Sequence, residues 1–247
     1  MRVVIFSGTT EGRRLSAQTA ALGAETIVCV ATEYGRTVQE QVPGAQTLSG
    51  RMDAEQMAEV LQTADLCIDA THPYARQASR NIRAAAERAK VPCRRLLRRE
   101  SELPPDCIVV DDAAAAARFL QSTAGNILLT TGAKELAAFS PVERSRLYPR
   151  VLPVQESLAA CEKMEIPRGH VIAMQGPFSC ELNTALIRQF SIRWLVTKDG
   201  GAAGGFAEKA EAAHETGARL VVIRRPPEDG EPYETILELC REMMGCR

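Results

Sequence analysis

Four side chains that can carry protons lie in two short polar segments of the sequence. His72 and Tyr74 come just after one apolar run, and Lys198 and Asp199 come just after another. An imidazole, a phenol, an ammonium or a carboxyl group can each supply a proton to a reacting atom. We therefore take these four residues as candidate catalytic residues, without ranking them. For His72, the alternative is a structural role in which the ring only bonds the backbone at a helix start.

A glycine turn near the N-terminus could bind phosphate. The apolar run 3–6 predicts a buried strand, the turn follows it, and a helical pattern comes next. Such a turn presents backbone N–H groups and the positive end of a helix dipole at one place. The spacing Gly8-Thr-Thr-Glu-Gly12 matches neither the dinucleotide G-x-G-x-x-G motif nor the P-loop, so a turn without a ligand explains it equally well. The candidate cofactor-binding residues of this turn are Gly8, Thr9, Thr10, Glu11 and Gly12.

The polar turn 32–36 follows the second predicted strand, where dinucleotide-binding folds contact the adenosine ribose. An acidic residue there binds the 2′-hydroxyl group, and an arginine binds a 2′-phosphate. Both Glu33 and Arg36 are present, so the form of the dinucleotide stays open. Thr32 and Arg36, with Thr71 and His72 from the later polar segment, complete the candidate cofactor-binding set.

A second glycine loop follows a predicted buried strand in the other half of the chain. Residues 198–205 contain a lysine, an aspartate and four glycines, and a helical pattern follows them. Exposed backbone N–H groups and an ammonium group at one place favour a site for an anion or a carboxylate. A flexible connector without a ligand is the alternative.

Apolar runs of strand length alternate with helical patterns along the chain, which predicts parallel sheets with right-handed crossovers. We expect an α/β fold with two Rossmann-like, doubly wound parallel-sheet domains and a cleft between them. Two prolines interrupt the pattern within 101–106, so the expected domains are a dinucleotide-binding domain, 1–106, and a substrate domain, 107–247. Strands are expected at 3–6, 25–31, 46–49, 65–69, 92–97, 126–130, 147–154, 170–174, 192–197 and 219–223.

Composition excludes several classes of function. Thirty basic and 31 acidic residues give a net charge of −1, so no global field recruits nucleic acid or an anionic membrane. No apolar run reaches the roughly 20 residues of a membrane span, and we expect a cytoplasmic protein without nucleic-acid or membrane partners. Eight cysteines include no C-x-x-C pair and the three histidines are scattered, so we expect neither a disulfide framework nor a metal site.

Six motifs in order resemble the precorrin-6A reductase family of corrinoid biosynthesis, including its cobalt-precorrin-6A branch. They are GTTEGR near the start, DATHPYA at 69–75, LLTTGAKEL at 128–136, QGPFS at 175–179, TKDGG at 197–201 and VVIRRP at 221–226. The resemblance spans nearly the whole chain. It implies a two-domain Rossmann-like enzyme that reduces one double bond of (cobalt-)precorrin-6A, to (cobalt-)precorrin-6B, with a reduced nicotinamide cofactor.

The substrate implied by the resemblance is a tetrapyrrole disc with many carboxylate groups, which cations and backbone N–H groups would bind. The segments VATEYGR and TKDGG are similar to those of the anaerobic, early-cobalt branch, which favours the cobalt form slightly and leaves NADPH and NADH as alternatives. The resulting candidate substrate-binding residues are Arg98, Arg99, Thr131, Gly132, Lys134, Gly176, Lys198, Gly200 and Gly201.

Two other classes of function remain as alternatives. A methyltransferase of the same pathway would also have two α/β domains, but the first strand is not followed by the E-x-G-x-G-type turn expected there. A non-catalytic nucleotide-binding module would need only the first glycine turn. Such a module leaves the polar segment around Lys198 unexplained.

Overall fold

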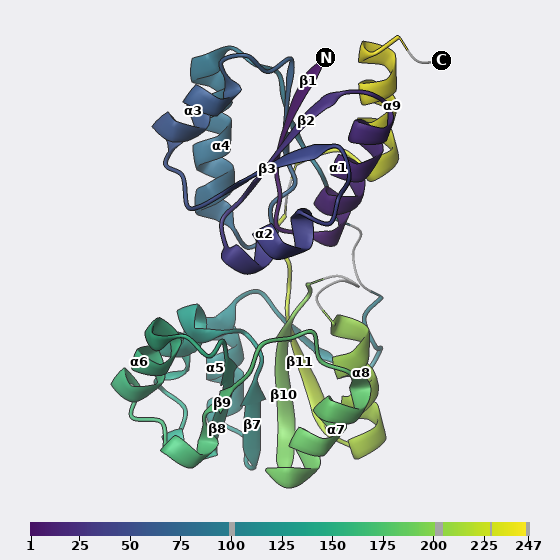
Figure 1. The fold of residues 1–247 in the computed structure, drawn as a ribbon. Helices are drawn as coiled ribbons and strands as arrows, with labels where there is room; N and C mark the ends of the chain where they lie inside the picture. The colour runs from purple at the N-terminus through teal and green to yellow at the C-terminus, as the bar shows by residue number, and fades with distance from the viewer. Residues whose placement is uncertain (99–101, 201–204, 228, 246–247) are drawn as a thin grey trace. The chain divides into compact units, whose positions relative to one another are not determined.

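The computed structural model describes residues 1–98, 102–200, 205–227 and 229–245, and the chain divides into two compact units (Figure 1). The first unit consists of Met1–Arg99 and Pro227–Arg247, and the second of Glu100–Pro226. The last residues of the chain therefore belong to the first unit, whereas the expected division assigned everything after residue 106 to the second domain. Each unit is described by itself below.

The first unit is built on a five-stranded parallel sheet with the strand order β3-β2-β1-β4-β5. After β1 the chain winds outward through β2 and β3, and then returns to place β4 on the other side of β1. The boundary between β1 and β4 is therefore the topological switch point, where open α/β sheets bind ligands. The strands are β1 (Arg2–Phe6), β2 (Glu25–Val30), β3 (Ala45–Ser49), β4 (Leu66–Asp69) and β5 (Cys93–Arg95).

Helices cover both faces of this sheet (Figure 1). One face carries α3 and α4, whose apolar residues pack on β1 and β4, and the other carries α1 and α9. The expected turn 32–36 is instead part of a short helix, α2, because Thr32 caps it by accepting a hydrogen bond from the Gly35 N–H group. The helices are α1 (Thr10–Ala21), α2 (Glu33–Gln39), α3 (Ala54–Leu61), α4 (Arg76–Ala89) and α9 (Tyr233–Met243).

The final helix belongs to the first unit because it completes the core of that unit. Ile236 of α9 is fully buried in the same apolar cluster as Leu15 of α1. The Tyr233 hydroxyl group also donates a hydrogen bond to the Gln18 Oε1 atom of α1, at 2.6 Å. A helical pattern in the sequence indicates an apolar stripe but not the sheet that the stripe covers, which explains the error in the domain assignment.

The second unit contains a six-stranded parallel sheet with the order β6-β11-β10-β7-β8-β9. Its switch point lies between β7 and β10, since β8 and β9 extend the sheet on one side of β7 and β10 returns to the other side. Short β6 was not expected from the sequence. The strands are β6 (Ile108–Val110), β7 (Asn126–Leu129), β8 (Leu147–Val151), β9 (Ile172–Ala173), β10 (Ile192–Lys198) and β11 (Arg219–Ile223).

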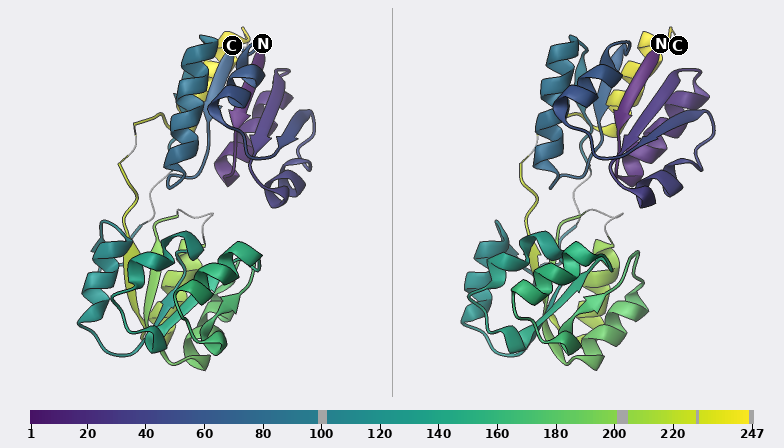
Figure 2. Two further views of the ribbon diagram at one scale, coloured as in Figure 1. Left: turned by 90° about the vertical axis from the view of Figure 1, so that its left-hand side faces the viewer. Right: turned by 60° about the vertical axis from the view of Figure 1, so that its left-hand side comes forward.

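Two apolar clusters lie on the two faces of the second sheet, and Figure 2 shows this layering from two further sides. The first cluster lies under α5, α6 and the 3₁₀ helix η1, and the second under α7 and α8. The expected fold class, two doubly wound parallel sheets, is confirmed. None of the described helices is both long enough and apolar enough to cross a membrane. The helices are α5 (Ala113–Gln121), η1 (Ala133–Phe139), η2 (Arg144–Arg146), α6 (Gln155–Lys163), η3 (Arg168–His170), α7 (Cys180–Gln189) and α8 (Phe206–Thr216).

Candidate active site

The structure brings the first glycine turn and the later polar segment together at the switch point of the first unit. Thr9 caps α1, since its Oγ1 atom accepts a hydrogen bond from the Gly12 N–H group at 3.1 Å. The same hydroxyl group donates to the Ala70 carbonyl oxygen at 2.8 Å, directly before Thr71. One side chain therefore ties the carboxyl ends of β1 and β4 to each other.

The two glycines of this turn have different physical roles. A Cβ atom at Gly12 would lie 2.6 Å from Ser7 Oγ and 2.9 Å from Ala70 Cβ, closer than side chains pack. A Cβ atom at Gly8 would meet nothing within 4 Å, and both Gly8 and Thr10 are exposed. Gly12 thus permits close packing of the turn, whereas Gly8 keeps the space in front of the helix start open.

A buried ion pair, which the sequence analysis did not single out, holds the later polar segment in place. The Asp69 carboxylate accepts a hydrogen bond from Arg95 Nη1 at 2.6 Å, and both side chains are at most 10% exposed. Asp69 Oδ1 also accepts bonds from the N–H and hydroxyl groups of Thr71, and Arg95 donates to the Thr71 hydroxyl oxygen. Asp69 and Arg95 line a cavity of about 650 Å³ together with Ser79 and Arg83 of α4.

His72 and Tyr74 form a stacked pair just beyond this network. Their ring centroids are 5.5 Å apart, and the His72 Nδ1 atom accepts a hydrogen bond from the Tyr74 backbone N–H group at 3.4 Å. In a neutral imidazole that bond puts the ring proton on Nε2. The structural alternative for His72, a bond to backbone, is therefore present, and it orients the ring.

Glu11 and Arg98 pair with each other across 87 residues of sequence. The Arg98 Nη2 atom lies 2.9 Å from Glu11 Oε2, and the arginine side chain is only 6% exposed. Arg98, a candidate substrate-binding residue, is therefore buried against Glu11 in the first turn of α1. The candidate residues Arg99 and Gly201 lie outside the described residues.

Thr32 and Arg36 lie on α2, directly after β2. Thr32 is the cap of this helix, and Arg36 forms exposed ion pairs with Glu40 at 2.6 Å and Glu33 at 3.6 Å. These carboxylates raise the pKa of Arg36, the hydrogen-bonded Glu40 most strongly. Both alternatives for the ribose site, acid and arginine, thus belong to one surface ion-pair cluster.

The switch point of the second unit carries another cluster of the predicted residues. Lys198 at the end of β10 pairs with Glu135 of η1 at 2.5 Å, and neighbouring Asp199 lies 3.5 Å from Arg225. Among the described residues the buried Thr131 Oγ1 atom has no hydrogen-bond partner, so it can still accept or donate a hydrogen bond. Gly132 has a φ of +79°, Lys134 is exposed and Gly200 is buried.

Gly176 lies at the same sheet edge after β9, which is two strands beyond β7. A Cβ atom there would lie 2.8 Å from the ring of Phe178, which stacks on the buried guanidinium group of Arg150. Arg150 and Lys209 were not expected from the sequence analysis, although an arginine within the otherwise apolar strand 147–151 is a signal of its own.

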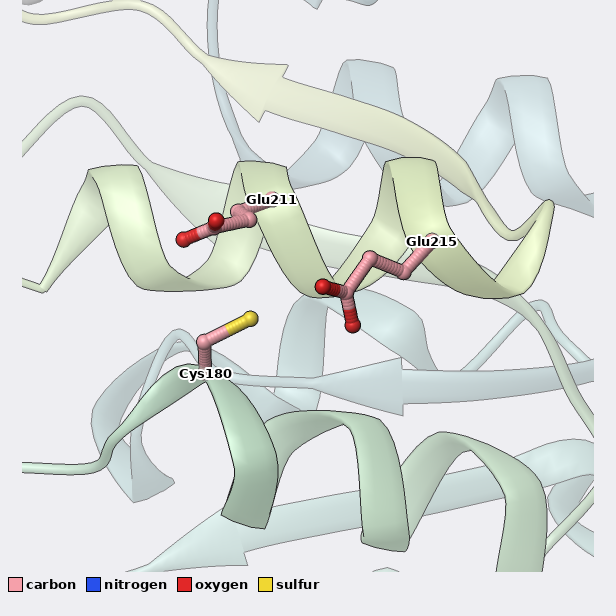
Figure 3. Close-up of side chains that lie close together, drawn as sticks. All are labelled: Cys180, Glu211 and Glu215. Atoms are coloured by element: carbon pink, nitrogen blue, oxygen red, sulfur yellow. The ribbon is translucent and has the colours of Figure 1, made fainter.

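Three possible metal ligands gather on α7 and α8, on the surface of the second unit (Figure 3). The Cys180 sulfur atom and carboxylate oxygens of Glu211 and Glu215 lie within 4.8 Å of one another. Desolvation and the two carboxylates raise the pKa of the Cys180 thiol, which favours the neutral thiol over the thiolate that metals bind. Glu215 also accepts a hydrogen bond from the Thr184 hydroxyl group. Within the described residues these three side chains form one group of possible metal ligands, and no further observation there connects it to a metal.

A family model described as precorrin-6x reductase CbiJ/CobK matches residues 2–243. The chain belongs to the precorrin-6x reductase family. It is 34% identical over 230 residues to a cobalt-precorrin-6A reductase of Salmonella typhimurium, covering 91% of this chain and 87% of the relative. It is 32% identical over 233 residues to a precorrin-6A reductase of Rhodococcus erythropolis, covering 92% and 90%.

A solved structure titled CobK precorrin-6A reductase has the same fold. It superposes with a TM-score of 0.73 at 24% sequence identity and covers 98% of this chain and 97% of that chain. Family membership confirms the resemblance and makes the chain an oxidoreductase of cobalamin biosynthesis that acts on a C=C bond of the macrocycle. It argues against a methyltransferase and against a non-catalytic module.

Proposed function

We propose that the chain reduces cobalt-precorrin-6A to cobalt-precorrin-6B with NADPH or NADH. The observation that carries the proposal is the hydrogen bond from Thr9 to the Ala70 carbonyl oxygen. This bond joins the glycine turn 8–12, which could bind phosphate, to the segment with the candidate proton donors His72 and Tyr74, at the switch point of the first unit. In doubly wound sheets, dinucleotides bind at such a point. We assign the cofactor to the first unit and the tetrapyrrole to the second unit.

The residues of the first switch point fit a dinucleotide. The open space beside Gly8 allows a diphosphate to approach the backbone, and the start of α1 offers N–H groups that helix geometry leaves unpaired. Gly12, Thr10 and Glu11 follow in the first turn of that helix, and Thr32 and Arg36 on α2 stand where the ribose would be contacted. When bound, a reduced nicotinamide supplies the hydride.

Reduction of a C=C bond adds a hydride and a proton, so the chain must also deliver a proton or order a water molecule that does. His72 and Tyr74 are the candidates in the first unit, and Lys198 and Asp199 in the second. Lys198 forms an ion pair with Glu135, and Asp199 forms one with Arg225. These ion pairs fix the orientation of both side chains, so that Lys198 could also position a carboxylate group of the substrate. We keep Thr131, Gly132, Lys134, Gly176 and Gly200 in the proposed substrate site.

The cobalt form of the substrate is preferred for two reasons. The segments VATEYGR and TKDGG are similar to those of the cobalt branch. Relatives from Salmonella typhimurium and Priestia megaterium, the latter 30% identical over 251 residues with 98% of each chain covered, carry the name cobalt-precorrin-6A reductase.

The test is anaerobic turnover of cobalt-precorrin-6A and of metal-free precorrin-6A, each with NADPH and with NADH. We expect a product heavier by two hydrogen atoms, formed in a one-to-one ratio with the oxidised cofactor, and faster with the cobalt form. No two-hydrogen product with either cofactor would overturn the proposed reaction. Faster turnover of the metal-free form would overturn the preference for cobalt alone.

A further inference from the structure

The second unit buries an arginine and a lysine near one edge of its sheet. Arg150 lies in β8, a strand buried along its whole length, and is 6% exposed, while Lys209 in the first turns of α8 is 8% exposed. Arginine and lysine are almost never fully buried unless they are paired, because removing a charge from water costs free energy. Two neighbouring buried cations therefore need an explanation.

Both residues lie on the face of the sheet that α7 and α8 cover. In the register of β7 and β8, Leu128 is opposite Tyr148, and both belong to the apolar cluster that also contains Phe206 of α8. Alternate residues of a strand share a face, so Arg150 lies on the same face as Tyr148, two positions nearer the carboxyl end. The carboxyl end is the edge at which the predicted substrate residues follow β7, β9 and β10.

Within the described part of the chain, the guanidinium group of Arg150 has only neutral partners. Its Nη1 atom donates to Asn183 Oδ1 at 2.7 Å, and its Cζ atom lies 3.8 Å from the centroid of the Phe178 ring. Asn183 is itself held by the bond from its Nδ2 atom to the Ser179 carbonyl oxygen, at 2.8 Å. These contacts fix the orientation of the guanidinium group but leave its positive charge without a carboxylate partner.

Lys209 adds a second buried cation to the surroundings of Arg150. Its Nζ atom donates to the Gly205 carbonyl oxygen at 3.0 Å. Burial lowers the pKa of Arg150 to about 10 and that of Lys209 to about 8, and the charge of Arg150 contributes to the second shift. The charge of Glu208 opposes that shift, and its buried Oε2 atom has no hydrogen-bond partner in the described part of the chain.

We propose that Arg150 and Lys209 bind a carboxylate side chain of the tetrapyrrole substrate. The proposal rests on the proposed function, because that function supplies a ligand with several carboxylates. A planar guanidinium group suits a carboxylate, with which it can form two parallel hydrogen bonds, and an ammonium group adds a point charge. The bound carboxylate supplies the negative charge that the described protein groups around Arg150 lack.

The test compares three variants that each remove one positive charge from the second unit. Arg150→Met and Lys209→Met replace the buried cations by apolar side chains of similar length. Arg188→Met removes an exposed cation of α7 and serves as the matched control. The probe is uroporphyrin, a tetrapyrrole octacarboxylate, and its dissociation constant is measured by fluorescence quenching without any nicotinamide cofactor. The unfolding midpoint of each variant is measured in parallel.

We expect the dissociation constant to rise about tenfold or more in Arg150→Met and in Lys209→Met, as for loss of a charge-assisted hydrogen bond, and to stay unchanged in Arg188→Met. The unfolding midpoint should stay level or rise, because each substitution removes a buried charge and its desolvation cost. Unchanged affinity in both buried variants, or no binding by the wild-type protein, would overturn the proposal. Binding without turnover of cobalt-precorrin-6A would overturn only the proposed function.

Discussion

Alanine substitution at the two glycines of the first turn separates a ligand role from a packing role. A methyl group at Gly12 would lie 2.6 Å from Ser7 Oγ and 2.9 Å from Ala70 Cβ. Ser7 and Ala70 are buried, so neither can move away cheaply. Overpacking of this kind costs about 1–3 kcal/mol. We therefore expect Gly12→Ala to lower the free energy of unfolding by about that amount, as measured by urea denaturation.

Gly8→Ala is the matched change in the same turn. The space around it is open and its backbone is not in the left-handed region, so the folded chain accommodates a methyl group. We expect the free energy of unfolding to stay level or to rise by about 0.4–1 kcal/mol, because alanine restricts the unfolded chain. The methyl group would, however, occupy the place where we propose that the diphosphate approaches the backbone, and cofactor affinity should fall at least about tenfold.

Titration calorimetry with NADPH and NADH, alongside urea denaturation of both variants, measures the two effects. The double variant Ser7→Gly/Gly12→Ala removes the nearest clashing atom and should recover part of the stability that Gly12→Ala loses. Wild-type cofactor affinity in Gly8→Ala would refute the assignment of the diphosphate to this turn. Full stability of Gly12→Ala would refute the packing argument.

Three further substitutions test the remaining groups. Arg36→Ala should raise the dissociation constant of NADPH about 10- to 150-fold and leave that of NADH nearly unchanged, if Arg36 contacts a 2′-phosphate. Calorimetry with both cofactors measures this, and equal losses would favour Glu33 and NADH. Lys198→Ala should raise the KM for the tetrapyrrole and leave the dissociation constant of the cofactor unchanged; the reverse pattern in steady-state kinetics would exchange the ligands of the two units. Asp69→Asn should lower the free energy of unfolding by about 3–5 kcal/mol, because buried Arg95 loses the negative charge of Asp69.

Partner variants serve as controls for two of these changes. Glu135→Gln leaves the Lys198 cation in place without its 2.5 Å partner, so tetrapyrrole binding should be retained where Lys198→Ala loses it. In the double variant Asp69→Asn/Arg95→Met, no buried charge of that pair remains, and much of the lost stability should return. A double variant as unstable as Asp69→Asn would contradict the account of the ion pair.

The sheets were predictable because buried parallel strands leave a strong local signal. Val3, Val4 and Ile5 are fully buried, and an apolar run is what a strand covered on both faces requires. Elements with weaker local signals were missed: β6 has three residues, and α2 depends on the Thr32 cap within a polar segment. The position of α9 in the first unit depends on which sheet has an apolar face that no other helix covers. That is a property of the assembled fold, which the local sequence does not contain.

The location of the candidate residues was predictable for the same reason, but their partners were not. Polar residues after β1, β4, β7 and β10 meet at two switch points because the carboxyl ends of parallel strands share an edge. Glu11 and Arg98 are 87 residues apart, and the sequence around either residue does not predict that the two side chains pair. Asp69 and Arg95 are likewise brought together by the pairing of β4 with β5.

The balance of charge differs between the two units, and this supports the way we divide the ligands. At the first switch point Arg95 pairs with Asp69 and Arg98 with Glu11, and we propose that backbone N–H groups at the start of α1 bind the diphosphate. In the second unit Arg150 is buried on neutral partners within the described residues. A ligand with one diphosphate gains most from oriented N–H groups at a helix start, whereas a disc with many carboxylates gains most from cations that the protein has not neutralised. This difference supports our proposal that the polycarboxylate binds to the second unit.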